Sequence, residues 1–139
     1  MNRRSLLLIE DNPDDIELTL RAMKAHQIAN EILVARDGVE ALTMLHGEGA
    51  MTPSLILLDL NLPKIDGFEV LRRIRVEERT SHLPVVVLTT SREERDILSS
   101  YELGANSYVH KPVDYHAFSE AIRQLGLYWI TLNLLPAKG

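Results

Sequence analysis

The sequence predicts an α/β protein built on one parallel sheet, and three observations carry this prediction. Short apolar runs rich in Val, Ile and Leu recur along the chain, as is typical of strands buried on both faces. A segment with helical spacing of apolar residues follows each run. Strand and helix therefore alternate five times, which is the order that builds a parallel sheet. The predicted strands are Leu6–Ile9, Ile32–Ala35, Leu55–Leu58, Val85–Leu88 and, more weakly, Ser107–Val109.

The predicted helices are identified by spacing and by their starts. In the first, Ile16, Leu20 and Met23 recur at helical intervals. Two later helices open on the pattern of a capping box, Asp37 before Glu40 and Ser91 before Glu94. The expected bounds are Pro13–His26, Gly38–His46, Phe68–Val76, Ser91 to about Leu103, and a fifth helix from about Asp114.

Composition limits the classes of function. The 139 residues suit one domain, and 45% hydrophobic with 25% charged residues is ordinary for a globular protein. The net charge of −5 argues against nucleic acid as a partner, since such domains are usually basic. Cysteine is absent, which excludes disulfides and thiolate metal sites. No apolar stretch reaches membrane-spanning length, so we expect a cytoplasmic protein without a membrane partner.

Polar residues follow the predicted strands at the point where each one ends. Glu10 and Asp11 follow the first strand, Asp59 the third, Thr89 the fourth and Lys111 the fifth. Because parallel strands joined by right-handed crossovers all point one way, these side chains should meet at one edge of the sheet. That edge is where open α/β sheets bind ligands.

The chemistry of this set favours a magnesium-assisted phosphoryl transfer. Clustered carboxylates are ligands for a hard divalent cation such as Mg²⁺. A cation, an ammonium and a hydroxyl together form the usual clamp on a phosphoryl group. Asp59 stands alone after its strand and is the best candidate nucleophile, whereas Glu10 and Asp11 are paired and suit metal binding. Asp14 and Asp15 are interpreted as ordinary acids of a solvated first helical turn.

Four separate motifs, LLIEDN, LILLDLNLPKIDGFEVL, PVVVLTTS and ANSYVHKPVD, resemble the receiver domain of two-component response regulators. The resemblance covers nearly the whole chain, and we divide it into a receiver domain, 1–126, and an apolar C-terminal extension, 127–139. It implies a flavodoxin-like fold with strand order 2-1-3-4-5. It also implies a signalling protein that accepts phosphate, rather than an enzyme with a separate substrate.

The resemblance assigns the roles of the metal and phosphate residues. Asp59 would accept the phosphoryl group from a phosphohistidine of a sensor histidine kinase. Asp11 and Asp59 would bind Mg²⁺ directly, together with the backbone carbonyl of Asn61. Glu10 would act on the cation mainly through a bound water molecule.

The resemblance also assigns the switch. Thr89 would bind the new phosphate and move with it, and Tyr108 would swing inward when Thr89 moves. Lys111 would pair with the acyl phosphate, and the bond between Lys111 and Pro112 is expected to be cis.

The C-terminal extension is apolar on two sides. A stripe that could pack on the sheet consists of Phe118, Ile122, Leu125, Trp129 and Leu132. The opposite side presents Leu127, Ile130 and Leu134, which we interpret as a dimer or partner surface together with the fourth helix, fifth strand and fifth helix. The alternative is that the chain kinks at Gly126 and folds back.

This extension and the motifs LTTS, ANSYVHKPV and YW…LLP resemble the single-domain regulators paired with bacterial and cyanobacterial phytochromes, which are typically dimeric. A phytochrome would then be the partner kinase, and no output domain is expected. Two alternatives stay open: a chemotaxis-type or other single-domain receiver with a different kinase, and a pseudo-receiver that only binds partners.

Overall fold

The computed structural model describes residues 4–29 and 31–136 and contains a five-stranded parallel sheet with the order β2-β1-β3-β4-β5. This confirms the predicted fold class and strand order. The strands are β1 (Ser5–Ile9), β2 (Glu31–Ala35), β3 (Leu55–Leu58), β4 (Val85–Thr89) and β5 (Ser107–His110).

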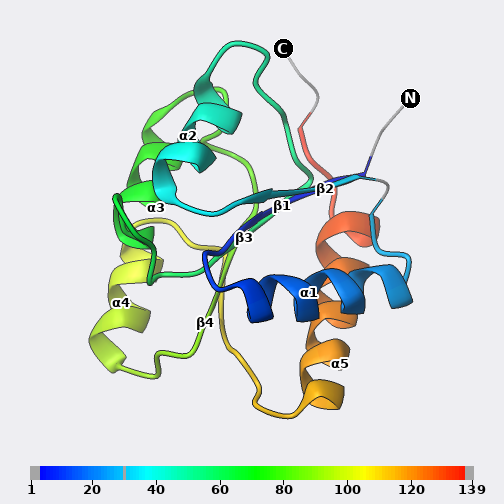
Figure 1. Cartoon of the computed structure of the whole chain (residues 1–139). Coiled ribbons are helices and arrows are strands. Elements are labelled where there is room, and N and C mark those ends of the chain that lie inside the picture. The colour runs from blue at the N-terminus through cyan, green and yellow to red at the C-terminus, as the bar shows by residue number, and fades with distance from the viewer. Residues whose placement is uncertain (1–3, 30, 137–139) are drawn as a thin grey trace.

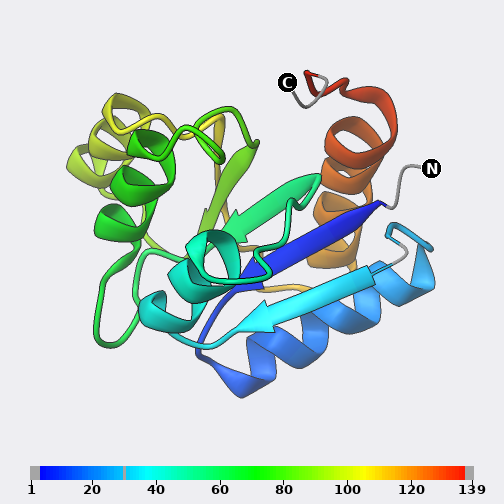
Figure 2. The same ribbon diagram turned by 90° about the horizontal axis from the view of Figure 1, so that it is seen from above.

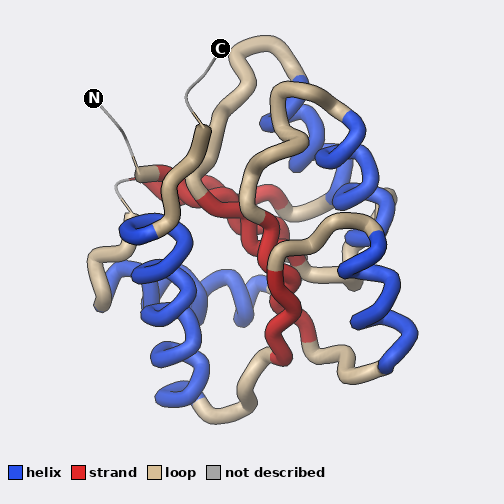
Figure 3. The backbone as a smooth tube through the Cα atoms, turned by 180° about the vertical axis from the view of Figure 1, so that it is seen from behind, coloured by secondary structure: helices blue, strands red, loops and turns tan. Residues whose placement is uncertain are grey.

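Helices cover both faces of the sheet (Figures 1 and 2). One layer holds α1 and α5, which pack on each other, and the other holds α2, α3 and α4; the strands lie between the two layers, as Figure 3 shows. The helices are α1 (Pro13–Ala25), α2 (Gly38–His46), α3 (Gly67–Val76), α4 (Glu94–Glu102) and α5 (Tyr115–Gly126), which continues into the π-helical segment η1 (Leu127–Leu132).

Alternation along the strands divides the core in two. In β3, Ile56 and Leu58 face the layer of α2 and α3, while Leu55 and Leu57 face the layer of α1 and α5. Successive side chains of a strand point to opposite faces, so a continuous apolar run supplies both cores at once. The same alternation holds in β1 and β4.

Most helices begin on a side chain that accepts hydrogen bonds from the first turn. Asp37, Asp66 and Asp114 cap α2, α3 and α5 in this way. The predicted capping box at Ser91 is wrong: α4 begins later, with Glu93 at its N-cap and no side-chain cap bond. The Ser91 hydroxyl instead donates to Asp96 Oδ2 at 2.7 Å, which connects the loop before α4 to the first turn of that helix.

The extension continues α5 without folding back at Gly126, whose backbone is helical. A Cβ on Gly126 would lie 2.5 Å from Ile28 Cγ2, so the α1–β2 loop packs closely on this turn. Trp129 and Ile130 pack on the core, and Ile130 is only 6% exposed. The prediction of Ile130 as an interface residue is therefore wrong, and so is that of Leu132 as a packing residue, since Leu132 is exposed.

The π-helical segment explains why Ile130 is buried and Leu132 is exposed. Its hydrogen bonds join residues five apart, as from Asn133 N to Tyr128 O, so the chain turns less per residue than in an α-helix. Ile130 is thereby brought to the side of Ile122, and Leu132 is carried away from the core. Across residues 4–29 and 31–136, no helix is both long and apolar enough to cross a membrane.

Candidate functional site

The residues that follow β1, β3 and β5 are held in place by the sheet itself. The backbone N–H of Asp59 donates to Ile9 O at 3.0 Å, and that of Lys111 donates to Thr89 O at 2.8 Å. Glu10 is fixed in the same way by a bond from its N–H to the last carbonyl of β2. The ladder thus extends one residue past the strands, and it sets the functional side chains side by side at the carboxyl edge.

Three carboxylates gather at this edge. Glu10, Asp11 and Asp59 each offer an oxygen, and these atoms all lie within 4.8 Å of one another. Glu10 is 3% and Asp59 8% exposed, whereas Asp11 is open to solvent. A donor set of oxygens alone, partly open to water, fits a hard cation that retains water molecules.

The ammonium of Lys111 is buried among carboxylates. Its Nζ lies 2.6 Å from Glu10 Oε1, 2.9 Å from Asp15 Oδ2 and 3.4 Å from Asp59 Oδ2. The sequence interpretation of Asp15 as a solvated first-turn acid is wrong on this point. No local pattern in the sequence signals this contact, because Asp11 lies before α1 begins at Pro13 and the place of Asp15 depends on how the helix packs.

Burial and neighbouring charges shift the pKa values of Glu10 and Lys111. Burial raises the pKa of Glu10 to about 7, and the nearby Asp59 adds to this, while the bond to Lys111 acts in the opposite direction. Burial alone would lower the pKa of the Lys111 ammonium, but its bonds to Glu10 and Asp15 and the charge of Asp59 hold it above the ordinary value. Lys111 therefore remains charged.

Thr89 and Tyr108 are connected through one residue of the β4–α4 loop. Thr89 is fully buried at the end of β4, and Ser91 N approaches its hydroxyl oxygen at 3.5 Å. The hydroxyl of Tyr108 donates to the carbonyl of Ser91 at 3.0 Å. Any shift of Thr89 toward the cleft would therefore act on the loop that holds the Tyr108 ring.

The loop after Asp59 is fixed by close backbone packing. Asn61 N donates to Asp59 Oδ1 at 3.3 Å, which turns the main chain of Asn61 beside the carboxylate. Gly67 donates to Leu60 O, and a Cβ on Gly67 would lie 2.6 Å from Asp59 O. This approach requires glycine, so Asp66-Gly67 does more than form a turn.

The expected cis bond between Lys111 and Pro112 is not present: among the described residues, every peptide bond is trans. The trans isomer is the more stable form of most X–Pro bonds, and from it the Lys111 side chain reaches Glu10, Asp15 and Asp59.

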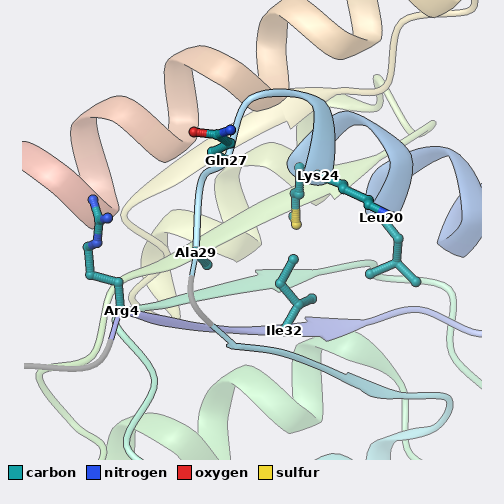
Figure 4. A pocket seen from close by; sticks show the side chains of 7 residues that line it. Arg4, Leu20, Lys24, Gln27, Ala29 and Ile32 are labelled. Carbon is teal, nitrogen blue, oxygen red and sulfur yellow. The ribbon is translucent and has the colours of Figure 1, made fainter.

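A cavity of about 600 Å³ lies at the opposite, amino edge of the sheet (Figure 4). Its lining combines two cations and an amide with apolar side chains and contains no carboxylate. It therefore does not overlap the acidic cluster. The lining residues are Arg4, Leu20, Met23, Lys24, Gln27, Ala29 and Ile32.

A family model, a curated relative and a solved structure all identify response regulators as similar to this chain. The family model of the response regulator receiver domain matches residues 6–123. Response regulator Rcp1 of Synechocystis sp. is 39% identical over 136 residues, which cover 95% of this chain and 92% of Rcp1. The crystal structure of the Mn²⁺-bound form of Rcp1 aligns with a TM-score of 0.88 at 38% identity, over 96% of this chain and 99% of that one.

Two further structures are similar along their full length. The phosphorylated cyanobacterial phytochrome response regulator RcpA aligns with a TM-score of 0.91 at 37% identity, over 98% of this chain and 100% of that one. The bacteriophytochrome response regulator AtBRR aligns with a TM-score of 0.74 at 49% identity, over 96% of this chain and 100% of that one.

Proposed function

Because the chain belongs to the response regulator receiver family, we propose that it is a response regulator that accepts a phosphoryl group on Asp59 from a sensor histidine kinase. One observation carries the proposal: the Asp59 carboxylate is buried between two further acids and the Lys111 ammonium. Rcp1, which this chain matches over 92% of that protein, is also a response regulator.

The transfer itself needs few protein groups. A carboxylate oxygen of Asp59 forms a bond to the phosphorus of the phosphohistidine, and the P–N bond breaks. The electron pair of that bond stays with the imidazole, which takes up a proton as it leaves. Lys111, 3.4 Å from Asp59 Oδ2, moves onto the phosphoryl oxygens and balances their charge.

Magnesium is the cation that we propose for this site. Asp11 and Asp59 would bind it directly with the backbone carbonyl of Asn61, and Glu10 through water. The fit rests on the oxygen-only cluster within 4.8 Å, and the Mn²⁺-bound form of Rcp1 shows that a relative binds a divalent cation. When bound, the cation neutralises the repulsion between Asp59 and the incoming phosphoryl group.

We propose that Thr89 and Tyr108 report the phosphorylated state. The Thr89 hydroxyl would donate to a phosphoryl oxygen and shift toward it. Because Ser91 contacts both Thr89 and Tyr108, that shift changes the loop before α4 and the setting of the Tyr108 ring. The changed surface comprises α4, β5 and α5.

A phytochrome kinase is the partner that we propose, because RcpA and AtBRR are phytochrome response regulators. We also propose a cytoplasmic homodimer that uses α4, β5, α5 and the exposed side of the extension. Leu127 and Leu134 are exposed there, at 46% and 90%, and nothing within the described chain covers them.

The test of the phosphoacceptor is phosphotransfer from the purified phytochrome kinase in red and far-red light, followed by intact mass. The wild-type protein should gain one phosphoryl group in the presence of Mg²⁺ and lose the gain in EDTA. Asp59→Asn should remain unmodified.

Asp66→Asn is the matched control, since asparagine also caps a helix and Asp66 lies outside the acidic cluster. Full modification of Asp59→Asn would overturn the assignment, and transfer in neither light state would overturn the phytochrome partner.

A further inference from the structure

The Lys111 ammonium has three N–H donors and three carboxylate partners. Two of these partners, Glu10 and Asp59, belong to the cluster that suits a cation. The third is Asp15, which comes from the first turn of α1 and is not part of that cluster. The side chain of Asp15 is 33% exposed, so it approaches Lys111 from the open side of the site.

The three contacts differ in what happens to them during the reaction. A bound cation attracts the oxygens of Glu10 and Asp59, and phosphorylation converts the Asp59 carboxylate into an acyl phosphate. Both changes weaken the hold of these two residues on Lys111. The contact from Asp15, at 2.9 Å, has no such competitor.

We propose that Asp15 is a positioning residue for Lys111 in the phosphoryl transfer, an inference that rests on the proposed function. Asp15 holds the ammonium beside Asp59 while the cation engages Asp59 directly and Glu10 through water. It touches neither the cation nor the phosphoryl group, and it acts through Lys111 alone. Without it, the only carboxylate partners left to Lys111 are Glu10 and Asp59, whose hold weakens during the reaction and leaves the phosphoryl oxygens as its main contact.

Asp14 provides a matched comparison. It neighbours Asp15 in the first turn of α1, and the backbone N–H groups of both residues donate to Asn12 Oδ1 at 2.9 and 3.1 Å. Its carboxylate is exposed and is not among the three that contact Lys111. Asp14→Asn and Asp15→Asn therefore remove the same charge from the same helix start, and only the second removes a charge that contacts Lys111.

The kinetic test uses phosphoramidate as the donor, with saturating Mg²⁺, and follows phosphorylation by intact mass. Asp15→Asn should lower the maximal rate about five- to tenfold, as expected for loss of one charge-assisted bond in the transition state. The donor concentration for half-maximal rate should stay unchanged, because Asp15 does not touch the donor. Asp14→Asn should behave as wild type, and Asp15→Glu should recover most of the rate.

A second readout needs no phosphorylation. In ¹⁵N-edited NMR spectra of the Mg²⁺-loaded protein, the Lys111 ammonium protons should exchange with water faster in Asp15→Asn than in Asp14→Asn. Equal rates and equal exchange in these two variants would overturn the role of Asp15. A wild-type protein that phosphoramidate does not modify would instead contradict the proposed function, and the NMR comparison would still decide whether Asp15 holds Lys111.

Discussion

At the scale of single residues, the site holds more negative charge than its one ammonium balances. Glu10, Asp11, Asp15 and Asp59 lie around Lys111 or within its cluster. Two like charges about 4 Å apart repel by roughly 4 kcal/mol at an effective dielectric constant near 20. The metal-free protein can relieve this repulsion by keeping a proton on Glu10. Because the unfolded chain loses this proton at lower pH, the free energy of unfolding depends on pH.

We expect the metal-free protein to lose stability as the pH rises from 4.5, the ordinary pKa of a glutamate, to about 7, the pKa of Glu10 in the folded state. Over this range the unfolded chain is ionised at Glu10 while the folded chain still binds the proton, so a higher pH favours unfolding. The loss is complete above about 7 and amounts to something on the order of 3 kcal/mol. Urea unfolding in EDTA at several pH values measures it.

Glu10→Gln isolates the contribution of Glu10 to the pH dependence of stability, because glutamine does not titrate. The variant should lack this part of the pH dependence, and Glu48→Gln, at an exposed loop position, should retain it. If the free energy of unfolding changes with pH by the same amount in wild type and Glu10→Gln, the link between burial of Glu10 and stability is refuted.

The residues that the sequence placed correctly are those attached to strand ends. Glu10, Asp59 and Lys111 had to converge, because the parallel order of the strands fixes where each backbone emerges. The contact of Asp15 with Lys111 was missed because it depends on how far α1 is rotated about its axis. That rotation follows from packing against α5, which no local pattern records.

At the scale of elements, α4 is the least firmly packed helix. Its only fully buried residue is Ser100, whose hydroxyl has no hydrogen-bond partner among the described residues, while Leu98 and Tyr101 are exposed. A buried polar group without a partner costs free energy, so the present position of α4 is held weakly. Such a helix is easily displaced by the loop that precedes it.

Ser100→Ala should raise the free energy of unfolding by about 1–2 kcal/mol, because it removes the unpaired hydroxyl and improves helix propensity. Ser99→Ala is the matched control on the same helix, and it should gain only the propensity part, about 0.5 kcal/mol. Urea unfolding of the unphosphorylated proteins compares them. An equal gain in both variants, or a loss at Ser100, would show that the hydroxyl is satisfied in solution.

Strands were predicted more accurately than helix ends. An apolar run four or five residues long, such as Leu55–Leu58, fixes a central strand because both faces must be buried. The start of α4 was wrong because the Ser91 side chain bonds to Asp96 instead of capping the helix. The side chains of the extension were assigned with α-helical spacing, and the π-helical turn after Gly126 changed which of them face the core.

At the scale of the whole molecule, the acidic cluster and the extension lie at opposite edges of the sheet. The helix α5 connects them: it begins shortly after Lys111 and ends where the extension starts (Figure 1). Its buried residues Phe118 and Ile122 fix it along the core. The chain between Lys111 and the proposed dimer surface therefore consists of a short loop followed by one unbroken helical segment.

The surface of the extension can be tested separately from its core. Leu127→Gln with Leu134→Gln should weaken the dimer at least tenfold and leave unfolding nearly unchanged, because both side chains are exposed in the single chain. Ile130→Ala should instead lower the free energy of unfolding by about 2–4 kcal/mol, since Ile130 is buried. Val39→Gln with Val76→Gln removes exposed apolar groups elsewhere and should leave the dimer intact.

Sedimentation over a range of concentrations, with and without phosphorylation of Asp59, measures the dissociation constant of the dimer. If the Leu127 and Leu134 variant keeps the wild-type constant in both states, the two chains must meet through another surface.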